Sequence, residues 1–148
     1  AALAHRDGGA GSVFDRQAAR YDAWYDTARG AAIFAEELRA LRPLTVGLPR
    51  SWLEIGVGTG RFAAALSVEV GVDPARGALE LARQRHVAVV AARGEALPFR
   101  TGSFGAAFIL LTLCFVADPL AVLREAARVV RPGEPSCKSR STMPNLDV

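Results

Sequence analysis

The apolar residues of this chain follow two spacings that alternate along its length. Short continuous apolar runs predict strands buried on both faces, and apolar residues recurring every three or four positions predict helices. The expected strands are 52–57, 68–72, 87–91 and 104–113, and the expected helices between and after them are 61–67, 75–85 and 119–130. Strands that alternate with helices in this way predict an α/β fold, with a parallel sheet covered on both faces.

Three details of this pattern can be checked against a structure. The fourth strand, 104–113, is apolar throughout and is therefore expected at the centre of the sheet. The helix that follows it begins at Pro119, a typical first-turn residue, and carries an apolar stripe. The members of that stripe are Leu120, Leu123, Ala127 and Val130.

Two further helices are expected before the first strand. Apolar residues at helical spacing predict one helix from residue 13, and Asp26-Thr27 is a typical N-terminal cap for another over 30–42. The first twelve residues are rich in glycine and alanine, which predicts a flexible arm. We therefore divide the chain into an arm (1–12), a helical lid (13–45), an α/β domain (46–134) and an atypical tail (135–148).

Composition excludes several classes of function. Hydrophobic residues make up 51% of the 148, enough to bury a core, but no apolar run reaches the length of a membrane span. The net charge of +3 is too small and too scattered to indicate nucleic-acid binding. Two cysteines cannot build a disulfide framework or a zinc site. We expect a cytoplasmic protein that binds neither membrane nor metal.

The segment 54–60, EIGVGTG, lies between the first strand and its helix. Glycines at this place let the backbone turn sharply and let a ligand lie against main-chain atoms. A dinucleotide-binding fingerprint would need glycine at the sixth position, counted from Gly56, where the chain has Arg61. That fingerprint also gives no role to Glu54. The loop therefore favours a different nucleoside ligand.

Asp73 ends the second expected strand, where doubly wound folds hold the hydroxyls of a ribose with a carboxylate. Its alternative role is to cap the helix that begins at Pro74. The residue type and position allow both interpretations, and the preceding glycine loop favours the ribose.

Several motifs in order along the chain resemble those of class I S-adenosylmethionine-dependent methyltransferases, of the small-molecule kind related to the quinone-biosynthesis methyltransferases. The motifs are Phe14-Asp15 with ARYDAWY at 19–25, EIGVGTG at 54–60, GVDP at 71–74, GEALPF at 94–99 and LREAARVVRPG at 123–133. The resemblance implies a doubly wound, Rossmann-like fold of strand order 3-2-1-4-5-7-6. It also implies in-line methyl transfer from S-adenosylmethionine to a small-molecule acceptor.

The resemblance also assigns cofactor-binding residues, position by position. Glu54, Gly56, Gly58 and Gly60 would line the methionine and ribose end, and Asp73 would hold the ribose. The segment 93–95, with Gly94 and Glu95, would border the adenine, and Thr112 with Leu113 would face the sulfonium. Tyr21 and Tyr25 would belong to a lid. Arg93 stands where the family commonly has an acidic residue, so adenine recognition would rest on the main chain. Gly105 replaces the family's usual Asp, a change expected to affect the start of the fourth strand more than the chemistry.

No residue receives a catalytic assignment. His5 lies in the arm and His86 at the wrong end of the sheet, and a free cysteine such as Cys114 is usually core packing. Tyr21 and Tyr25, with Trp24, either form a cation–π surface for a sulfonium or fasten the N-terminal helices to the domain.

The tail differs from the rest of the chain. The only Lys, Met and Asn (Lys138, Met143 and Asn145) all follow Pro135, and the stretch after Gly133 has no strand pattern where the family has a fifth strand. We expect a truncated methyltransferase whose fourth strand is left at an edge, which predicts self-association through that edge. The alternative function is a catalytically silent fragment that binds the cofactor or associates with itself.

Overall fold

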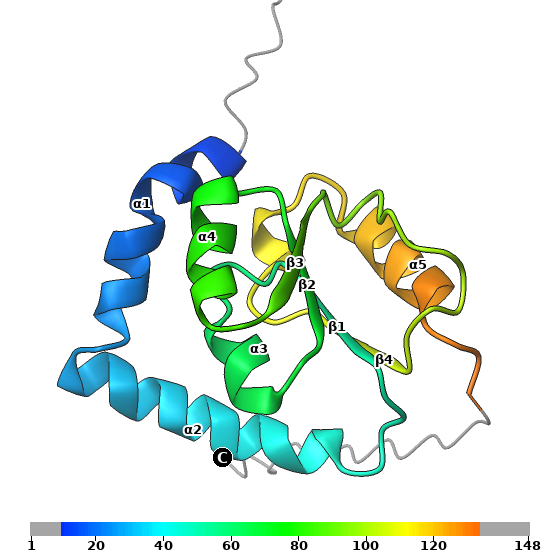
Figure 1. Ribbon diagram of the computed structural model, residues 1–148, viewed down its shortest axis with the longest axis horizontal. Coiled ribbons are helices and arrows are strands. Elements are labelled where there is room, and N and C mark those ends of the chain that lie inside the picture. The colour runs from blue at the N-terminus through cyan, green and yellow to red at the C-terminus, as the bar shows by residue number, and fades with distance from the viewer. Residues whose placement is uncertain (1–9, 134–148) are drawn as a thin grey trace, which may run out of the picture.

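The computed structural model describes residues 10–133, in which four strands form one parallel sheet (Figure 1). The strands are β1 Trp52–Ile55, β2 Val70–Asp73, β3 Ala88–Ala91 and β4 Ala106–Phe108. Their order is β3-β2-β1-β4, and each neighbouring pair is parallel. The predicted parallel sheet and its Rossmann-like strand order are therefore confirmed for these four strands.

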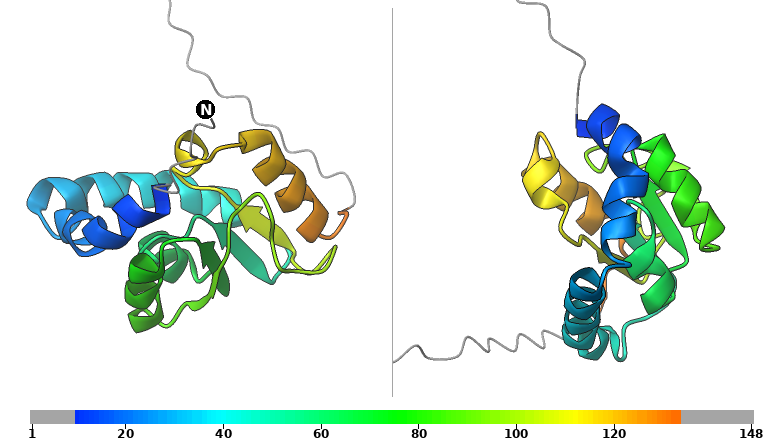
Figure 2. Two further views of the ribbon diagram at one scale, coloured as in Figure 1. Left: turned by 90° about the horizontal axis from the view of Figure 1, so that it is seen from above. Right: turned by 90° about the vertical axis from the view of Figure 1, so that its left-hand side faces the viewer.

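Helices cover both faces of this sheet, and α5 lies on the side opposite α2, α3 and α4 (Figures 1 and 2). The helices are α1 Ala10–Trp24, α2 Ala28–Thr45, α3 Arg61–Leu66, α4 Arg76–Gln84 and α5 Pro119–Val129, with a short 3-10 helix η1 at Leu113–Phe115. Because successive side chains of a strand point to opposite faces, β1 contributes Trp52 to one core, and Leu53 and Ile55 to the other. This explains why all four residues of the strand are buried, Glu54 included.

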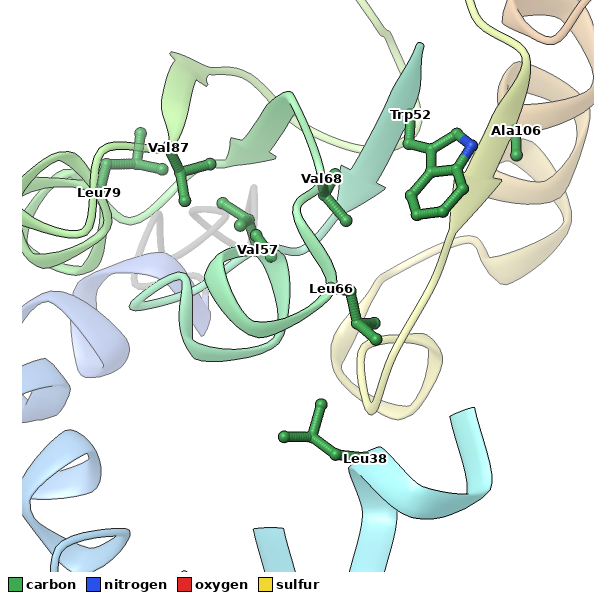
Figure 3. Close-up of a cluster of buried hydrophobic side chains, with 9 residues drawn as sticks. Leu38, Trp52, Val57, Leu66, Val68, Leu79, Val87 and Ala106 are labelled. Carbon is green, nitrogen blue, oxygen red and sulfur yellow. The ribbon is translucent and has the colours of Figure 1, made fainter. Parts of the chain in front are cut away.

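The core beneath α2, α3 and α4 is formed by side chains from both the helices and the strands (Figure 3). Its labelled members are Leu38, Trp52, Val57, Leu66, Val68, Leu79, Val87 and Ala106. The core beneath α5 comprises Leu53, Ile55, Val72, Leu97, Phe104, Val122 and Val129. The two cores hold β1 and β2 rigidly, so the loops that follow these strands start from fixed positions.

The N-terminal helices pack on the same side of the sheet as α3 and α4 (Figure 1). Thr27 caps α2 as predicted, and its hydroxyl accepts a hydrogen bond from the Gly30 backbone N–H at 3.1 Å. Helix α1 lies against α4 through a small cluster that includes Ala18 and Ala78. Of the predicted arm, residues 1–9 lie outside the described residues and α1 begins at Ala10. The division into arm, lid and domain stays a prediction.

The fourth strand is shorter than predicted and is not central in the described sheet. Strand β4 has three residues and pairs with β1, whose register ends with Glu54 opposite Phe108. Leu111, with φ of 55°, then turns the chain out of extended backbone. On the far side of β4, the described chain adds one isolated parallel bridge between Phe104 and Val130. The apolar run 104–113 alone does not show where β1, the strand that pairs with it, ends, and that end limits the length of β4.

Helix α5 buries a different stripe from the one its sequence suggested. Val122 and Val129 are fully buried against the sheet, whereas Leu120 and Leu123 are about half exposed. Both stripes recur at helical spacing, so periodicity could not choose between them. Asp118, whose carboxylate accepts from the Ala121 N–H at 3.0 Å, caps the helix at its predicted start.

Two expectations concern regions that the described residues leave open. The tail, 134–148, lies outside them, so its lack of strand character stays a prediction, as does self-association through β4.

Among the helices of residues 10–133, none combines the length and the apolar composition needed to cross a membrane.

Candidate functional site

A cavity of about 910 Å³ opens at the carboxyl ends of the strands, between the loops that follow them and helix α1. This is where doubly wound sheets bind ligands, because the strand order places several loops around one crevice there. Of the predicted site residues, it brings together Tyr21, Tyr25, Glu54, Gly56, Gly58, Asp73, Arg93, Gly94, Glu95 and Thr112. Gly60 and Leu113 do not line it.

The glycine loop between β1 and α3 has left-handed backbone at three positions, with φ of 79° at Gly56, 51° at Gly58 and 78° at Gly60. A Cβ at Gly56 would lie 2.2 Å from Oγ1 of Thr112, so only glycine fits beneath the η1 segment. A Cβ at Gly60 would lie 2.8 Å from Cβ of Ala82, which explains why this residue faces α4 instead of the cavity. At Gly58 nothing lies within 4 Å of an added Cβ.

Gly58 and Gly47 form a matched pair for separating backbone strain from ligand contact. Both have positive φ and open space around an added Cβ, but only Gly58 lines the cavity. Gly58→Ala and Gly47→Ala should each lower the free energy of unfolding by about 1 kcal/mol. Only Gly58→Ala should also weaken nucleoside binding, by about tenfold or more, in a calorimetric titration. Equal nucleoside affinities of the two variants would show that the loop does not contact the ligand.

Asp73 connects the glycine loop to the start of α4. One carboxylate oxygen accepts from the Gly58 backbone N–H at 3.0 Å and the other from the Ala75 N–H at 2.8 Å. The second bond closes a turn across Pro74: α4 begins at Arg76 with Ala75 at its N-cap position, so Asp73 lies before the cap and not in the capping position that the sequence allowed. A carboxylate at the carboxyl end of this strand is also the group with which doubly wound folds hold ribose hydroxyls.

Glu54 is a buried carboxyl group at the base of the cavity. Its residue is 2% exposed, and no described group hydrogen-bonds to its Oε2 atom. Burial, followed by the negative charge of Asp73, raises the pKa of Glu54 to about 8. An unpaired buried carboxyl is costly, which marks this position as a place where a cationic ligand group would be stabilised.

The segment after β3 forms a further wall of the cavity. Gly94 packs tightly, since a Cβ there would lie 2.9 Å from Ile55. Arg93 donates to the Glu95 carboxylate at 3.3 Å, and its side chain is 66% exposed. Burial acts to raise the pKa of Glu95, but backbone hydrogen bonds, including one from Ala117, and the Arg93 charge outweigh it and hold the pKa below its ordinary value.

The η1 side of the cavity is mostly apolar. Leu111, Phe115 and Val116 line it, and the Thr112 hydroxyl donates to the Leu110 carbonyl at 2.9 Å. Cys114, which we expected in the core, is exposed and lines the cavity, because the short η1 helix follows where a longer strand was predicted.

The two histidines add no catalytic group to the described site. His86 is exposed in the turn between α4 and β3, away from the cavity, as predicted. His5 lies outside the described residues. No group of three or more His, Cys, Asp or Glu that could hold a metal ion occurs within 10–133.

On the opposite side of the cavity, Tyr21 and Tyr25 are one helical turn apart, and their hydroxyl oxygens lie 3.1 Å from each other. Tyr25 is buried and its ring packs edge-on against Trp24 and Phe34. The guanidinium carbon of Arg61, at the start of α3, lies 5.4 Å from the centre of the Tyr25 ring, and Phe34 packs edge-on against Phe62 of α3, so these aromatic residues contact the α/β domain in the fastening role that the sequence allowed. Both tyrosines also line the cavity. The cation–π role, which needs a cationic ligand group against their rings, stays a prediction.

Sequence reasoning missed an ionic cluster beside the glycine loop. Asp22 of α1 receives hydrogen bonds from Arg61, at the start of α3, and from Arg85, just after α4. In the sequence alone, Arg61 is significant only because it stands where the dinucleotide-binding fingerprint needs glycine. An acidic residue between the aromatic residues Tyr21 and Tyr25 was the available signal, but a sequence does not tell which of many arginines pairs with it.

Residues 53–134 match the family model described as "Methyltransferase domain". An uncharacterised protein of Mycobacterium tuberculosis is 52% identical over 124 residues, which are 84% of this chain and 44% of that protein. A demethylmenaquinone methyltransferase of Corynebacterium kroppenstedtii is 42% identical over 85 residues, 55% of this chain and 37% of that enzyme.

A solved structure from Thermotoga maritima shares the fold and much of the sequence. It is described as a SAM-dependent methyltransferase and possible histamine N-methyltransferase. The two superpose with a TM-score of 0.75 at 40% identity, over 83% of this chain and 57% of that one. This chain therefore spans about half the length of the relatives that it matches.

Proposed function

Because the chain belongs to the methyltransferase-domain family, whose cofactor is S-adenosylmethionine, we propose that it transfers the cofactor's methyl group to a small-molecule acceptor. The observation that carries the proposal is the cavity itself. It is lined by the glycine loop, by the carboxylate of Asp73 at the position typical of ribose binding, and by the buried carboxyl of Glu54, whose Oε2 atom has no hydrogen-bond partner. All three lie at the carboxyl ends of parallel strands. The acceptor's identity is outside this proposal.

The residues present fit the cofactor's separate chemical groups. The Oε2 atom of Glu54 is buried without a hydrogen-bond partner, and it suits the ammonium of the methionine end. Gly58 lets a ligand approach the main chain closely, and the Asp73 carboxylate, which lines the cavity at the end of β2, suits the ribose hydroxyls. The segment 93–95 would border the adenine, and Thr112 would lie near the sulfonium.

When bound, S-adenosylmethionine supplies an electrophilic methyl group on a sulfonium, so little covalent help from the protein is required. The chain's contribution is to hold the reactants in line and to exclude water. Tyr25 is suited to hydrogen bonding rather than to proton abstraction, because burial and the Tyr21 hydroxyl raise its pKa well above the ordinary value. No histidine lines the described cavity. An acceptor that arrives as a ready nucleophile suits such a site best.

Calorimetric titration with S-adenosylhomocysteine and, separately, with NADH tests the cofactor assignment. We expect saturable, one-to-one binding of S-adenosylhomocysteine and no detectable binding of NADH. Binding of NADH alone would favour the dinucleotide interpretation that Arg61 argues against. Methyl transfer to a panel of amines, phenols and quinols then separates an active enzyme from a silent cofactor-binding fragment.

A further inference from the structure

Helix α1 is held beside the cavity by a compact ionic cluster, which we call the Asp22 cluster and define as Asp22, Arg61 and Arg85. Arg61 binds the Asp22 carboxylate with two nitrogens, Nε at 2.8 Å and Nη2 at 3.0 Å. Arg85 donates to Oδ2 of the same carboxylate at 2.7 Å, an oxygen that also accepts from Nη2 of Arg61. The carboxylate is thus bound by guanidinium groups from two different helix ends.

The cluster is also bonded to the glycine loop. The second terminal nitrogen of Arg85, Nη1, donates to the Thr59 carbonyl at 2.8 Å, and Arg61 follows Gly60 directly in the chain. Arg61 donates in addition to the backbone carbonyl of Asp22 at 2.9 Å. The position of α1 is therefore coupled to the loop that would hold the cofactor.

The three side chains of the cluster are largely shielded from solvent, so their charges depend on hydrogen bonds to one another instead of on water. The side chains of Asp22, Arg61 and Arg85 are 12%, 15% and 26% exposed. Burial opposes ionisation of Asp22, but hydrogen bonds from Arg61, Thr59 and Arg85 outweigh it and lower its pKa to about 2. The cluster therefore stays charged at neutral pH. Neutralising Asp22 would leave two shielded guanidinium groups without the carboxylate that they share, which is costly even though Arg61 also bonds to Asp26 and Arg85 to the Thr59 carbonyl.

Asp22 lies next to Tyr21 and one turn from Tyr25, and the tyrosines line the cavity whereas Asp22 does not. Among the described side chains, the buried apolar cluster between α1 and α4 consists of Ala18, Ala75 and Ala78. The hydrogen bonds of Asp22 add a polar attachment of α1 to the start of α3 and the end of α4.

We propose that Asp22, held by Arg61 and Arg85, is a positioning residue that keeps the Tyr21–Tyr25 pair across the cofactor cavity and so slows cofactor release. This inference rests on the proposed function, because it assigns the pair to a bound S-adenosyl ligand. Asp22 acts through α1 and the tyrosines, without contact to the ligand.

The test compares Asp22→Asn with Asp26→Asn. Asp26 also accepts from Arg61, at 2.8 Å, but its side chain is 69% exposed, so its ion pair should contribute little. In stopped-flow binding of S-adenosylhomocysteine, Asp22→Asn should raise the dissociation rate constant at least about tenfold. Asp26→Asn should stay within about twofold of the unsubstituted chain. A purely structural defect would lower the signal amplitude and leave the rate constants unchanged.

A second readout follows α1 without any ligand. Tryptic cleavage at Arg20, an exposed residue of α1, requires local opening of the helix and should accelerate in Asp22→Asn but not in Asp26→Asn. If the unsubstituted chain fails to bind S-adenosylhomocysteine, the proposed function fails, and the cleavage rates still report whether the cluster holds α1. If that chain binds and Asp22→Asn releases the ligand at an unchanged rate, the positioning role is overturned.

Should Asp22→Asn not unfold cooperatively, Arg85→Gln provides the same test. It removes one guanidinium from Asp22 and the bond to Thr59, and it leaves Arg61 in place. Arg83→Gln is its matched control, because Arg83 lies on the same helix in an exposed pair with Glu80. Faster release in Arg85→Gln alone supports the role, and equal release rates in both variants contradict it.

Discussion

Asp73→Asn should lower the affinity for S-adenosylhomocysteine by about 100-fold, because a carboxylate that accepts from a sugar hydroxyl makes a charge-assisted bond. The substitution also disturbs the loop directly. An asparagine has one acceptor oxygen, so it can keep either the Gly58 or the Ala75 backbone bond but not both. Loss of affinity alone would therefore not separate a ribose contact from a loop distortion.

Pairing the substitution with a change in the ligand makes that separation. The unsubstituted chain should bind adenosine more tightly than 2′,3′-dideoxyadenosine, and Asp73→Asn should bind the two about equally. Asp118→Asn is the matched control, since Asp118 caps α5 and does not line the cavity. An undiminished preference for adenosine in Asp73→Asn would show that the carboxylate serves only the loop and the helix start.

The elements that could be predicted from the sequence are those fixed by local chemistry. Thr27 and Asp118 cap their helices because each is a short polar residue directly before an apolar periodic segment. Strands β1 and β2 follow from apolar runs that end in a glycine loop and in Asp-Pro. Most residues of the candidate site follow from the family resemblance, and they meet in one cavity because the carboxyl ends of parallel strands share one edge of the sheet.

The failures concern choices that depend on distant neighbours. The length of β4 is set by where β1 stops, and the buried face of α5 is set by which stripe meets Ile55 and Leu97. The resemblance places Gly60 among the ligand-lining glycines, but Gly60 packs against Ala82, which lies 22 positions further along the chain. The Asp22 cluster joins residues up to 63 positions apart, beyond the range of any local pattern.

Glu54→Gln should remove a pH dependence that the unsubstituted chain shows in ligand binding. Because the pKa of Glu54 is about 8 in the ligand-free chain, this group is mostly protonated at pH 7, and Asp73 is the neighbouring charge that helps to keep it so. A ligand ammonium favours the ionised form, so binding S-adenosylhomocysteine at neutral pH should release close to one proton. The affinity should therefore rise about tenfold per pH unit from pH 6 toward pH 8 and then level off.

Stability of the ligand-free chain should change with pH in the opposite direction. Between about pH 5 and pH 8 the folded chain retains the Glu54 proton that the unfolded chain has released, so the free energy of unfolding falls as pH rises. The carboxylates with lowered pKa, Asp22 and Glu125, act in another window. Their contribution is lost only as the pH falls below the ordinary carboxyl range. Glu54→Gln should flatten the slope above pH 5 and leave the acid limb intact.

Calorimetry in two buffers of different ionisation enthalpy measures the proton released on binding. Adenosine is the matched ligand, because it has no ammonium group and should bind the unsubstituted chain without the rise toward pH 8. Glu54→Gln should bind S-adenosylhomocysteine about tenfold more weakly at pH 8, with no proton release, since a neutral amide cannot form the charge-assisted bond. If the unsubstituted chain binds this ligand with equal affinity at pH 6 and pH 8, the ammonium does not lie at Glu54, and the buried carboxyl has a structural role instead.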